Sequence, residues 1–108
     1  MNWNVQEKLK EVKNVALDRL KKKSMSVSFI YMFTMQGCVH CAEFKEKKMG
    51  EIVNGIKNKY EYKVCDITES PYYKQILFSA DVHQVPTILL FSKGKVSSYT
   101  PDQFISTL

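Results

Sequence analysis

The sequence predicts an α/β protein in which a mixed central sheet of about four strands is flanked by helices, with a helix first. Two runs without charge, residues 27–34 and 86–91, suit strands that are buried on both faces. Segments with apolar residues at helical spacing precede and separate these runs, so crossovers between parallel strands are expected. Lys93-Gly94 follows the second run and is typical of a hairpin turn, which adds an antiparallel strand.

The N-terminal half is expected to contain one helix on each side of the strand at residues 27–34. The first helix covers residues 4–22 and the second covers residues 39–58. Gly50 and Gly55 weaken the second helix, and mark a bend in it or its end. Apolar side chains at helical spacing define the faces that both helices should bury: Val5, Leu9, Val12, Ala16, Leu20, Phe44, Met49, Ile52, Val53 and Ile56.

The C-terminal half continues the alternation of strands and helices. A strand is expected over residues 60–67, and a Ser-Pro pair at 70–71 then begins a helix. After the strand of residues 86–91, residues 96–99 return antiparallel, and a Thr-Pro pair at 100–101 has the order of a capped helix start. One α/β domain is therefore expected to account for residues 1–108. Three residues of the strand at 60–67 should share one face: Tyr60, Tyr62 and Val64.

The composition argues against several classes of protein. With 108 residues, of which 44% are hydrophobic and 25% charged, the chain suits one ordinary globular core. No apolar run approaches the ~20 residues needed to cross a bilayer, and the first residues lack the apolar core of a secretory signal. We therefore expect a cytoplasmic monomer without a membrane partner. The net charge of +5 comes from fifteen lysines and one arginine, whereas nucleic-acid readers favour arginine, so no nucleic-acid partner is expected.

Two of the three cysteines lie where the strand of residues 27–34 gives way to a helix. The first turn of a helix presents unpaired N–H groups and the positive end of the helix dipole, which favour a thiolate at Cys38. Two intervening residues bring Cys41 back to the same turn, so a disulfide can close between the two. Cys65 lies in an apolar strand and is expected to be a packed thiol, with a regulatory or dimerising thiol as the alternative. An odd number of cysteines suits a reducing compartment.

This pattern predicts thiol–disulfide exchange. Cys38 is expected to attack a partner disulfide, and Cys41 to attack the Cys38 sulfur and release the reduced partner. His40 would stabilise the Cys38 thiolate as a cation or a hydrogen-bond donor, which makes the couple more oxidising; an exposed and indifferent His40 is the alternative. Three neighbours should form the rim around the sulfur: Gln36, Gly37 and Val39.

Metal binding is the structural alternative for the cysteine pair. A closed zinc site needs four ligands, and no second close pair of cysteines exists. The only other soft candidates are dispersed along the chain: His40, Cys65 and His83. We therefore expect no metal.

Two motifs carry a family resemblance: Gly37-Cys38-Val39-His40-Cys41 after a strand, and Val85-Pro86-Thr87 at the start of another. On these motifs, residues 27–99 resemble the thioredoxin superfamily. The resemblance implies a thioredoxin fold in which Pro86 is cis, lies opposite the cysteine pair and follows backbone that pairs with an extended substrate. A trans proline that simply starts the strand is the alternative. The residues expected to bind substrate are Gln36, Val85, Pro86 and Thr87.

Other positions depart from that family. Typical thioredoxins carry Trp before the glycine, Gly-Pro between the cysteines and a buried Asp in the preceding strand. This chain has Gln36, Val39-His40 and Met32 in those places. Proton removal from Cys41 must then use another group or water, with Asp66 and Lys63 as candidates. The glycine-rich glutathione loop of glutaredoxins is also absent, which disfavours a glutathione-dependent role.

The sequence thus predicts an enzyme, a thiol–disulfide oxidoreductase active in electron transport. Its redox group would be the Cys38–Cys41 disulfide, with no bound cofactor. Its expected partners are disulfide-containing proteins or small thiols, together with an upstream reductase. A redox-silent binding module with the same fold is the main alternative, and a metal- or cluster-binding protein is the second.

Overall fold

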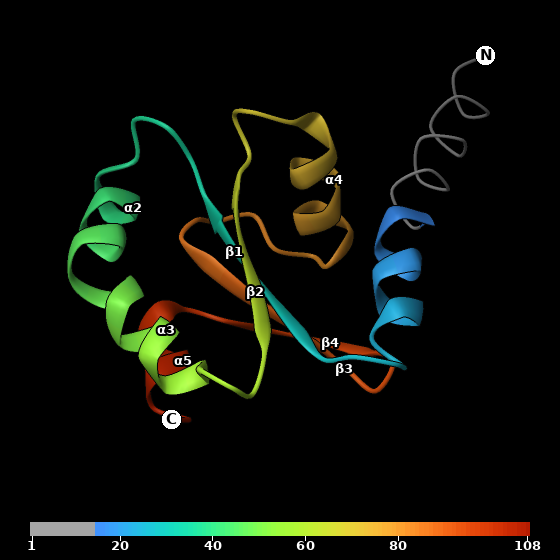
Figure 1. The fold of residues 1–108 in the computed structure, drawn as a ribbon. Coiled ribbons are helices and arrows are strands. Elements are labelled where there is room, and N and C mark those ends of the chain that lie inside the picture. The colour runs from blue at the N-terminus through green and yellow to red at the C-terminus, as the bar shows by residue number, and fades with distance from the viewer. Residues whose placement is uncertain (1–14) are drawn as a thin grey trace, which may run out of the picture.

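The computed structural model describes residues 15–108, which form a four-stranded sheet with helices on both faces (Figure 1). A helix at residues 15–23 comes first. The elements that follow are β1 (Phe29–Thr34), α2 (Val39–Glu43), the π-helical turn η1 (Phe44–Lys48), α3 (Met49–Ile56), β2 (Glu61–Asp66), α4 (Pro71–Ser79), β3 (Thr87–Ser92), β4 (Lys95–Tyr99) and α5 (Pro101–Ile105).

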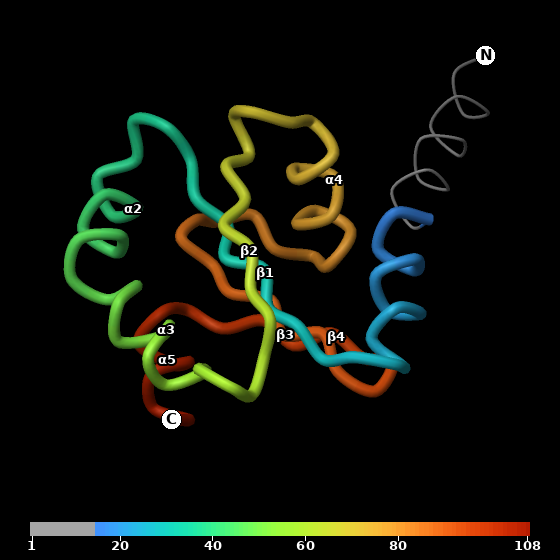
Figure 2. The backbone as a smooth tube through the Cα atoms, in the orientation of Figure 1, coloured from blue at the N-terminus to red at the C-terminus, as the bar shows by residue number. Residues whose placement is uncertain are grey.

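The sheet has the strand order β2-β1-β3-β4. Strands β1 and β2 are parallel, whereas β3 runs antiparallel to both β1 and β4. The backbone trace shows the two long crossovers and the tight hairpin that this order requires (Figure 2). The predicted fold class, an α/β protein with a mixed sheet of four strands and a helix first, is confirmed.

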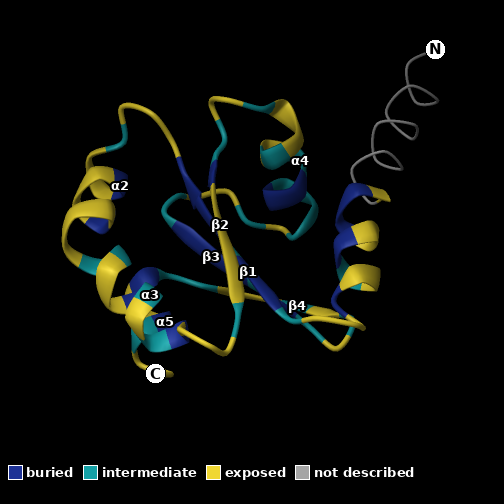
Figure 3. Ribbon diagram, viewed as in Figure 1, coloured by how far each residue is buried: buried dark blue, intermediate teal, exposed yellow. Residues whose placement is uncertain are grey.

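Apolar side chains fill both faces of the central strands, which are the most buried part of the molecule (Figure 3). One face is covered by the helix of residues 15–23 and by α4, and its core contains Ala16, Leu17, Leu20, Phe29, Phe33, Cys65, Ile76, Leu77, Leu89 and Phe91. The other face is covered by the α2-η1-α3 helix and by α5, and its core contains Ile30, Met32, Phe44, Ile52, Ile56, Ile88 and Phe104. β1 therefore contributes to both cores, as its uncharged sequence predicts.

The first helix is bonded to the hairpin between β3 and β4. Lys93 and Gly94 both have positive φ, 54° and 78°, as a two-residue type I′ turn requires. The Ser24 hydroxyl accepts a hydrogen bond from the Gly94 N–H across 2.9 Å, and the Ser24 carbonyl accepts one from the Lys93 N–H across 3.0 Å. Ser24 therefore fixes the end of the helix against the turn.

Tyr62 and Val64 share one face of β2, as expected, and they are 47% and 37% exposed on this edge strand. The second helix ends at Ile56, directly after Gly55, so this glycine marks the end of the helix and not a bend. The irregularity within the helix is the π-helical turn at Phe44–Lys48. The expected start of the first helix at residues 4–14 lies outside the described residues. Within residues 15–108, no helix combines the length and the apolar character needed to cross a bilayer.

Candidate active site

Cys38 is the N-cap residue of α2, in the position that the sequence predicts. A turn after β1 leads to it, and Gly37 there has a φ of 78°, which a side chain would disfavour. The Cys38 backbone is extended, and its Sγ atom accepts a hydrogen bond from the Cys41 N–H across 3.1 Å. A sulfur at this place satisfies one of the N–H groups that the first turn of the helix leaves unpaired.

The loop before β3 supplies the opposite wall of the site. The Val85–Pro86 peptide bond is cis, and the Cys38 Sγ atom lies 3.9 Å from the Val85 carbonyl oxygen. The Thr87 side chain is buried and its hydroxyl donates a hydrogen bond to the Gln84 carbonyl across 2.8 Å. Thr87 therefore holds this loop and does not offer its hydroxyl to solvent.

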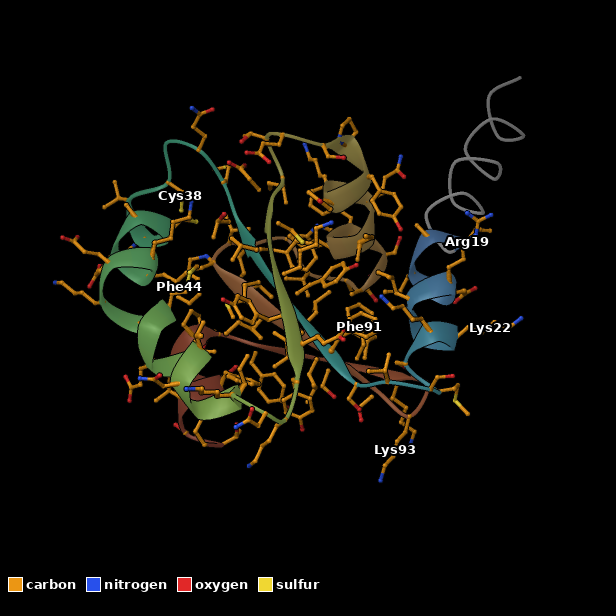
Figure 4. The ribbon with its side chains drawn as sticks, in the orientation of Figure 1. Arg19, Lys22, Cys38, Phe44, Phe91 and Lys93 are labelled. Carbon is orange, nitrogen blue, oxygen red and sulfur yellow. The ribbon has the colours of Figure 1, made fainter. Side chains whose placement is uncertain are left out.

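The two sulfur atoms differ in access. Cys38 is half-buried, whereas Cys41 is only 2% exposed and lies on the inner side of α2 (Figure 4 labels Cys38 at the start of this helix). Burial, together with the hydrogen bond to Cys38, raises the pKa of the Cys41 thiol to about 11. The site thus has an accessible sulfur, that of Cys38, and a buried, protonated thiol, that of Cys41.

A hollow of about 380 Å³ reaches Cys41 from the side of β2. Its charged lining residues are Lys45, Asp66 and Glu69. The Lys45 cation lies one helical turn after Cys41. Its charge lowers the pKa of the Cys41 thiol, whereas burial raises it. The sequence offered no signal for Lys45 or Glu69 beyond the i, i+4 spacing of Lys45 from Cys41.

Asp66 and Thr68 connect the redox loop to the end of β2. The Gln36 N–H donates to the Thr68 hydroxyl across 3.4 Å, and that hydroxyl donates in turn to the Asp66 carboxylate. The Thr68 N–H donates to the same carboxylate across 2.8 Å. These bonds lower the pKa of Asp66. Asp66 is therefore a stable anion beside the hollow and a weak acceptor for a proton.

The other predicted residues lie at different distances from the sulfur. Val39 is 78% exposed and His40 is also exposed, so both lie on the outer side of α2. Lys63, a candidate for the Cys41 proton, has its Nζ atom 5.2 Å from the Tyr73 ring centre, on the α4 side of the sheet. It is not among the residues that line the hollow beside Cys41. The structure therefore brings Asp66, and not Lys63, to that hollow.

Cys65 is fully buried under α4, where desolvation raises the pKa of its thiol to about 12. It contributes to the opposite core from the one that contains Met32 and Phe44. Within the described part of the chain, no three His, Cys, Asp or Glu side chains are close enough together to hold a metal ion.

A second hollow, of about 420 Å³, lies on the other side of the Val85–Pro86 loop. Polar side chains from three segments line it: Asp81, His83, Gln84, Ser98, Thr100 and Gln103. His83, named from the sequence only as a dispersed candidate metal ligand, is one of the residues that line this hollow.

Comparison with known proteins supports the fold. No model of a known protein family matches the chain, and no curated protein matches it either. Among solved structures, a thioredoxin from Fasciola hepatica is 18% identical with a TM-score of 0.57, over 78% of this chain and 77% of that one. A structure from work on the thiol resolving mechanism in yeast mitochondrial 1-Cys peroxiredoxin via glutathione/thioredoxin systems is 17% identical, with a TM-score of 0.60 over 91% and 88% of the two chains.

The J-Trx1 fragment of ERdj5 is 12% identical with a TM-score of 0.60, and the match covers 86% of this chain and 42% of that one. Together, these neighbours show the fold of the chain. The chain has the thioredoxin fold, with a Cys-Val-His-Cys pair at the start of the helix after β1.

Proposed function

We propose that this protein is a thiol–disulfide oxidoreductase that works through Cys38 and Cys41. The arrangement of the two sulfurs carries this proposal. The Cys38 Sγ atom accepts an N–H bond at the start of a helix, is half-exposed, and faces the Val85 carbonyl across 3.9 Å. Cys41 lies behind it on the same turn. Fold neighbours that include a thioredoxin support a redox role.

The reaction has two exchange steps. The Cys38 thiolate attacks one sulfur of a substrate disulfide; the S–S bond breaks, and the other substrate sulfur leaves as a thiolate that takes up a proton. Cys41 then loses its proton and attacks the Cys38 Sγ atom. This forms the Cys38–Cys41 disulfide and releases the second substrate thiol. Two electrons pass from the cysteine pair to the substrate, and the reverse sequence oxidises a dithiol.

The backbone beside Cys38 suits an extended substrate. The Val85 carbonyl faces the sulfur, and Pro86 has no N–H to compete for a partner. Val85 and Pro86 are both half-buried, so substrate can reach them. Gln36 and Val39, both exposed, would contact the substrate on the helix side. His40 would act on the thiolate through its charge, since it shares the same first turn.

The partners in this proposal are disulfide-containing proteins or small thiols, and a reductase that returns electrons to the pair. Such a monomeric carrier needs a compartment that keeps thiols reduced. The odd number of cysteines suits the cytoplasm in this respect. The direction of net electron flow depends on the reduction potential of the pair.

A trapping experiment tests the proposal. In Cys41→Ser, the second step is blocked, so a substrate disulfide should remain covalently attached to Cys38 and be released only by added thiol. Incubation with a disulfide-bonded peptide followed by intact mass measurement should show one adduct per chain. Cys65→Ala is the matched control, because that thiol is buried, and it should accumulate no adduct.

The Cys38→Ser variant distinguishes a thiol–disulfide oxidoreductase from a redox-silent binding module. It should form no adduct and have no exchange activity. If Cys41→Ser collects no adduct, or if Cys38→Ser still exchanges disulfides, the assignment of Cys38 as nucleophile is wrong. A redox-silent binding module would collect no adduct in Cys41→Ser. It would also still bind its partner in both Cys41→Ser and Cys38→Ser.

A further inference from the structure

The net positive charge of the chain is concentrated at one end of the sheet. Three segments meet there, residues 21–28, 57–61 and 92–95, which we call the basic end. They contain seven of the sixteen basic side chains and one of the eleven acidic ones, a formal charge of +6. The rest of the chain has nine basic and ten acidic side chains, a formal charge of −1. This distribution is far from the mixed surface that keeps an ordinary protein soluble.

Specific contacts hold the three segments together. The Ser28 and Ser92 hydroxyls are hydrogen-bonded across 2.7 Å, and Ser24 holds the hairpin turn at Gly94 across 2.9 Å. Val27 and Ser28 line a common hollow with residues 58–61. The lysines therefore extend from a fixed base, which lowers the entropy lost when they bind together.

The charges at the basic end have few compensating partners. Within residues 15–108, the ion pairs are Lys47 with Glu43 and Lys48 with Asp102, and neither pair lies at this end. Glu61 is the single carboxylate in the three segments. All of the lysines except Lys21 are exposed: Lys22, Lys23, Lys57, Lys59, Lys93 and Lys95. Like charges at this density repel one another, and an anionic surface would relieve the repulsion.

Apolar side chains are exposed among these lysines. Met25 is 69% exposed and Val27 is 38% exposed. A Cβ atom added at Gly94 would lie 2.6 Å from the Met25 sulfur, so Met25 rests on the hairpin turn of Lys93 and Gly94. An exposed thioether on a surface rich in lysine suits an interface that is anionic at its surface and apolar just beneath it.

We propose that the basic end binds the anionic headgroups of a lipid membrane surface, with the lysines on the headgroups and Met25 at the apolar boundary. Clusters of four to eight basic residues are enough for such binding. A nucleic acid is less well matched, because these segments contain no arginine and their single aromatic residue, Tyr60, is half-buried. The expectation of no membrane partner rested on the lack of a spanning segment, and peripheral binding needs none.

This orientation leaves the redox site free. Cys38 follows the C-terminal end of β1, whereas the basic end leads into the start of β1 and contains the first residue of β2 (Figure 4 shows Lys93 and Cys38 on opposite sides of the molecule). A strand of six residues spans roughly 20 Å, so Cys38 would face away from the membrane at about that height. The proposal does not depend on the redox function.

Vesicle cosedimentation of the full chain provides the test. The protein should bind vesicles of 30% phosphatidylserine in phosphatidylcholine at least tenfold more tightly than pure phosphatidylcholine at ~0.1 M salt. Lys93→Glu with Lys95→Glu should weaken binding more than tenfold. Lys57→Glu with Lys59→Glu, on a different segment, should do the same, which separates a binding effect from a folding defect in the hairpin.

Lys47→Glu with Lys74→Glu is the matched control, since it changes the net charge equally on other surfaces of the molecule. It should change binding less than threefold, and Met25→Ser should weaken binding on anionic vesicles only. Equal loss in all charge variants would mean that net charge alone acts, and would overturn the proposal. It would also be overturned by equal binding to both kinds of vesicle, or by binding to a DNA oligonucleotide without binding to vesicles.

Discussion

The Cys41 N–H donates a hydrogen bond to the Sγ atom of Cys38 across 3.1 Å, so the backbone of the second cysteine contacts the sulfur of the first. The Cys41 sulfur is itself buried, and burial raises the pKa of its thiol to about 11. In the proposed reaction, Cys41 would serve the first step with its amide and the second with its thiol. The expected kinetic consequence is a fast attack by Cys38 and a slower step that waits for Cys41 to lose its proton.

Lys45→Met should slow that second step. Burial is the main cause of the high pKa of Cys41. A hydrogen bond with the Met35 backbone opposes it, and the Lys45 cation beside the same hollow opposes it to a smaller extent. Because Lys45 is exposed and solvent screens its charge, we expect a modest, two- to fivefold decrease in the rate of resolution near neutral pH. The reaction with an aromatic disulfide reports both steps, since each releases one coloured thiolate.

Lys47→Met is the control for this prediction, because Lys47 lies on the same helix, is exposed and pairs weakly with Glu43. The first release should be unchanged in both variants. A second release that is equally fast with and without Lys45 would show that the Lys45 charge does not assist the loss of the Cys41 proton.

Ser24→Ala should destabilise the protein by about 1–2 kcal/mol. The Ser24 hydroxyl accepts from the Gly94 N–H and donates to the Lys21 carbonyl across 2.6 Å, so the substitution leaves two backbone groups without that partner. Urea unfolding measures the change in the free energy of unfolding. Ser26→Ala is the control at an exposed site two residues away. A loss of less than 0.3 kcal/mol for Ser24→Ala would mean that water replaces the hydroxyl at no cost.

Thr34→Val should preserve or raise stability, by up to about 1 kcal/mol. Thr34 is fully buried at the end of β1, and its hydroxyl oxygen has no hydrogen-bond partner among the described residues. Valine has nearly the same shape and removes the buried polar atom. Thermal and urea unfolding would measure the difference. A decrease of more than 1 kcal/mol would show that an internal water binds this hydroxyl.

Cys65 should make the protein sensitive to alkali. Its folded pKa is raised to about 12 by burial, against about 8.5 in an unfolded chain. The unfolded state therefore loses this proton first, and the stabilisation is complete below pH ~8.5 and is lost as the pH rises from there towards 12. Between pH 8 and 10.5, this group should remove about 2–3 kcal/mol from the free energy of unfolding.

The Cys65→Ala variant tests this prediction. The free energy of unfolding of the variant and of the unchanged protein would be measured against pH under reducing conditions. The variant will be less stable at pH 8 because of the cavity, but its stability should fall less between pH 8 and 10.5. The Cys41 thiol contributes in the same direction in both proteins. Parallel profiles would mean that Cys65 does not stay protonated in the fold.

The sequence was most informative where burial leaves little choice of residue. The uncharged run before Cys38 predicts β1, which is buried on both faces, and the Lys93-Gly94 pair predicts the hairpin. It was less informative at β2, because alternation of side chains shows which residues share a face but not how far that face is buried. Tyr62, on the same face as Val64, is 47% exposed.

The candidate site was predictable only in part. Cys38 and Cys41 can be identified from local spacing, and both lie where that spacing places them. The contact of Cys38 with Val85 joins residues 47 positions apart, so it could be expected only from the family resemblance. Lys45 and Glu69 meet beside Cys41 because of how the helix is set on the sheet, and no pattern in the sequence reports that. The π-helical turn at η1 is likewise invisible to periodicity.

The reduction potential of the Cys38–Cys41 pair tests the central claim most directly. The protein would be equilibrated in graded thiol–disulfide buffers, trapped by alkylation and counted by mass. Our account predicts one reversible two-electron transition that involves Cys38 and Cys41, disappears in Cys41→Ser and is unchanged in Cys65→Ala. A strongly reducing midpoint would indicate a reductase, and a more oxidising one would indicate a disulfide donor or isomerase. The absence of any reversible transition would contradict the account.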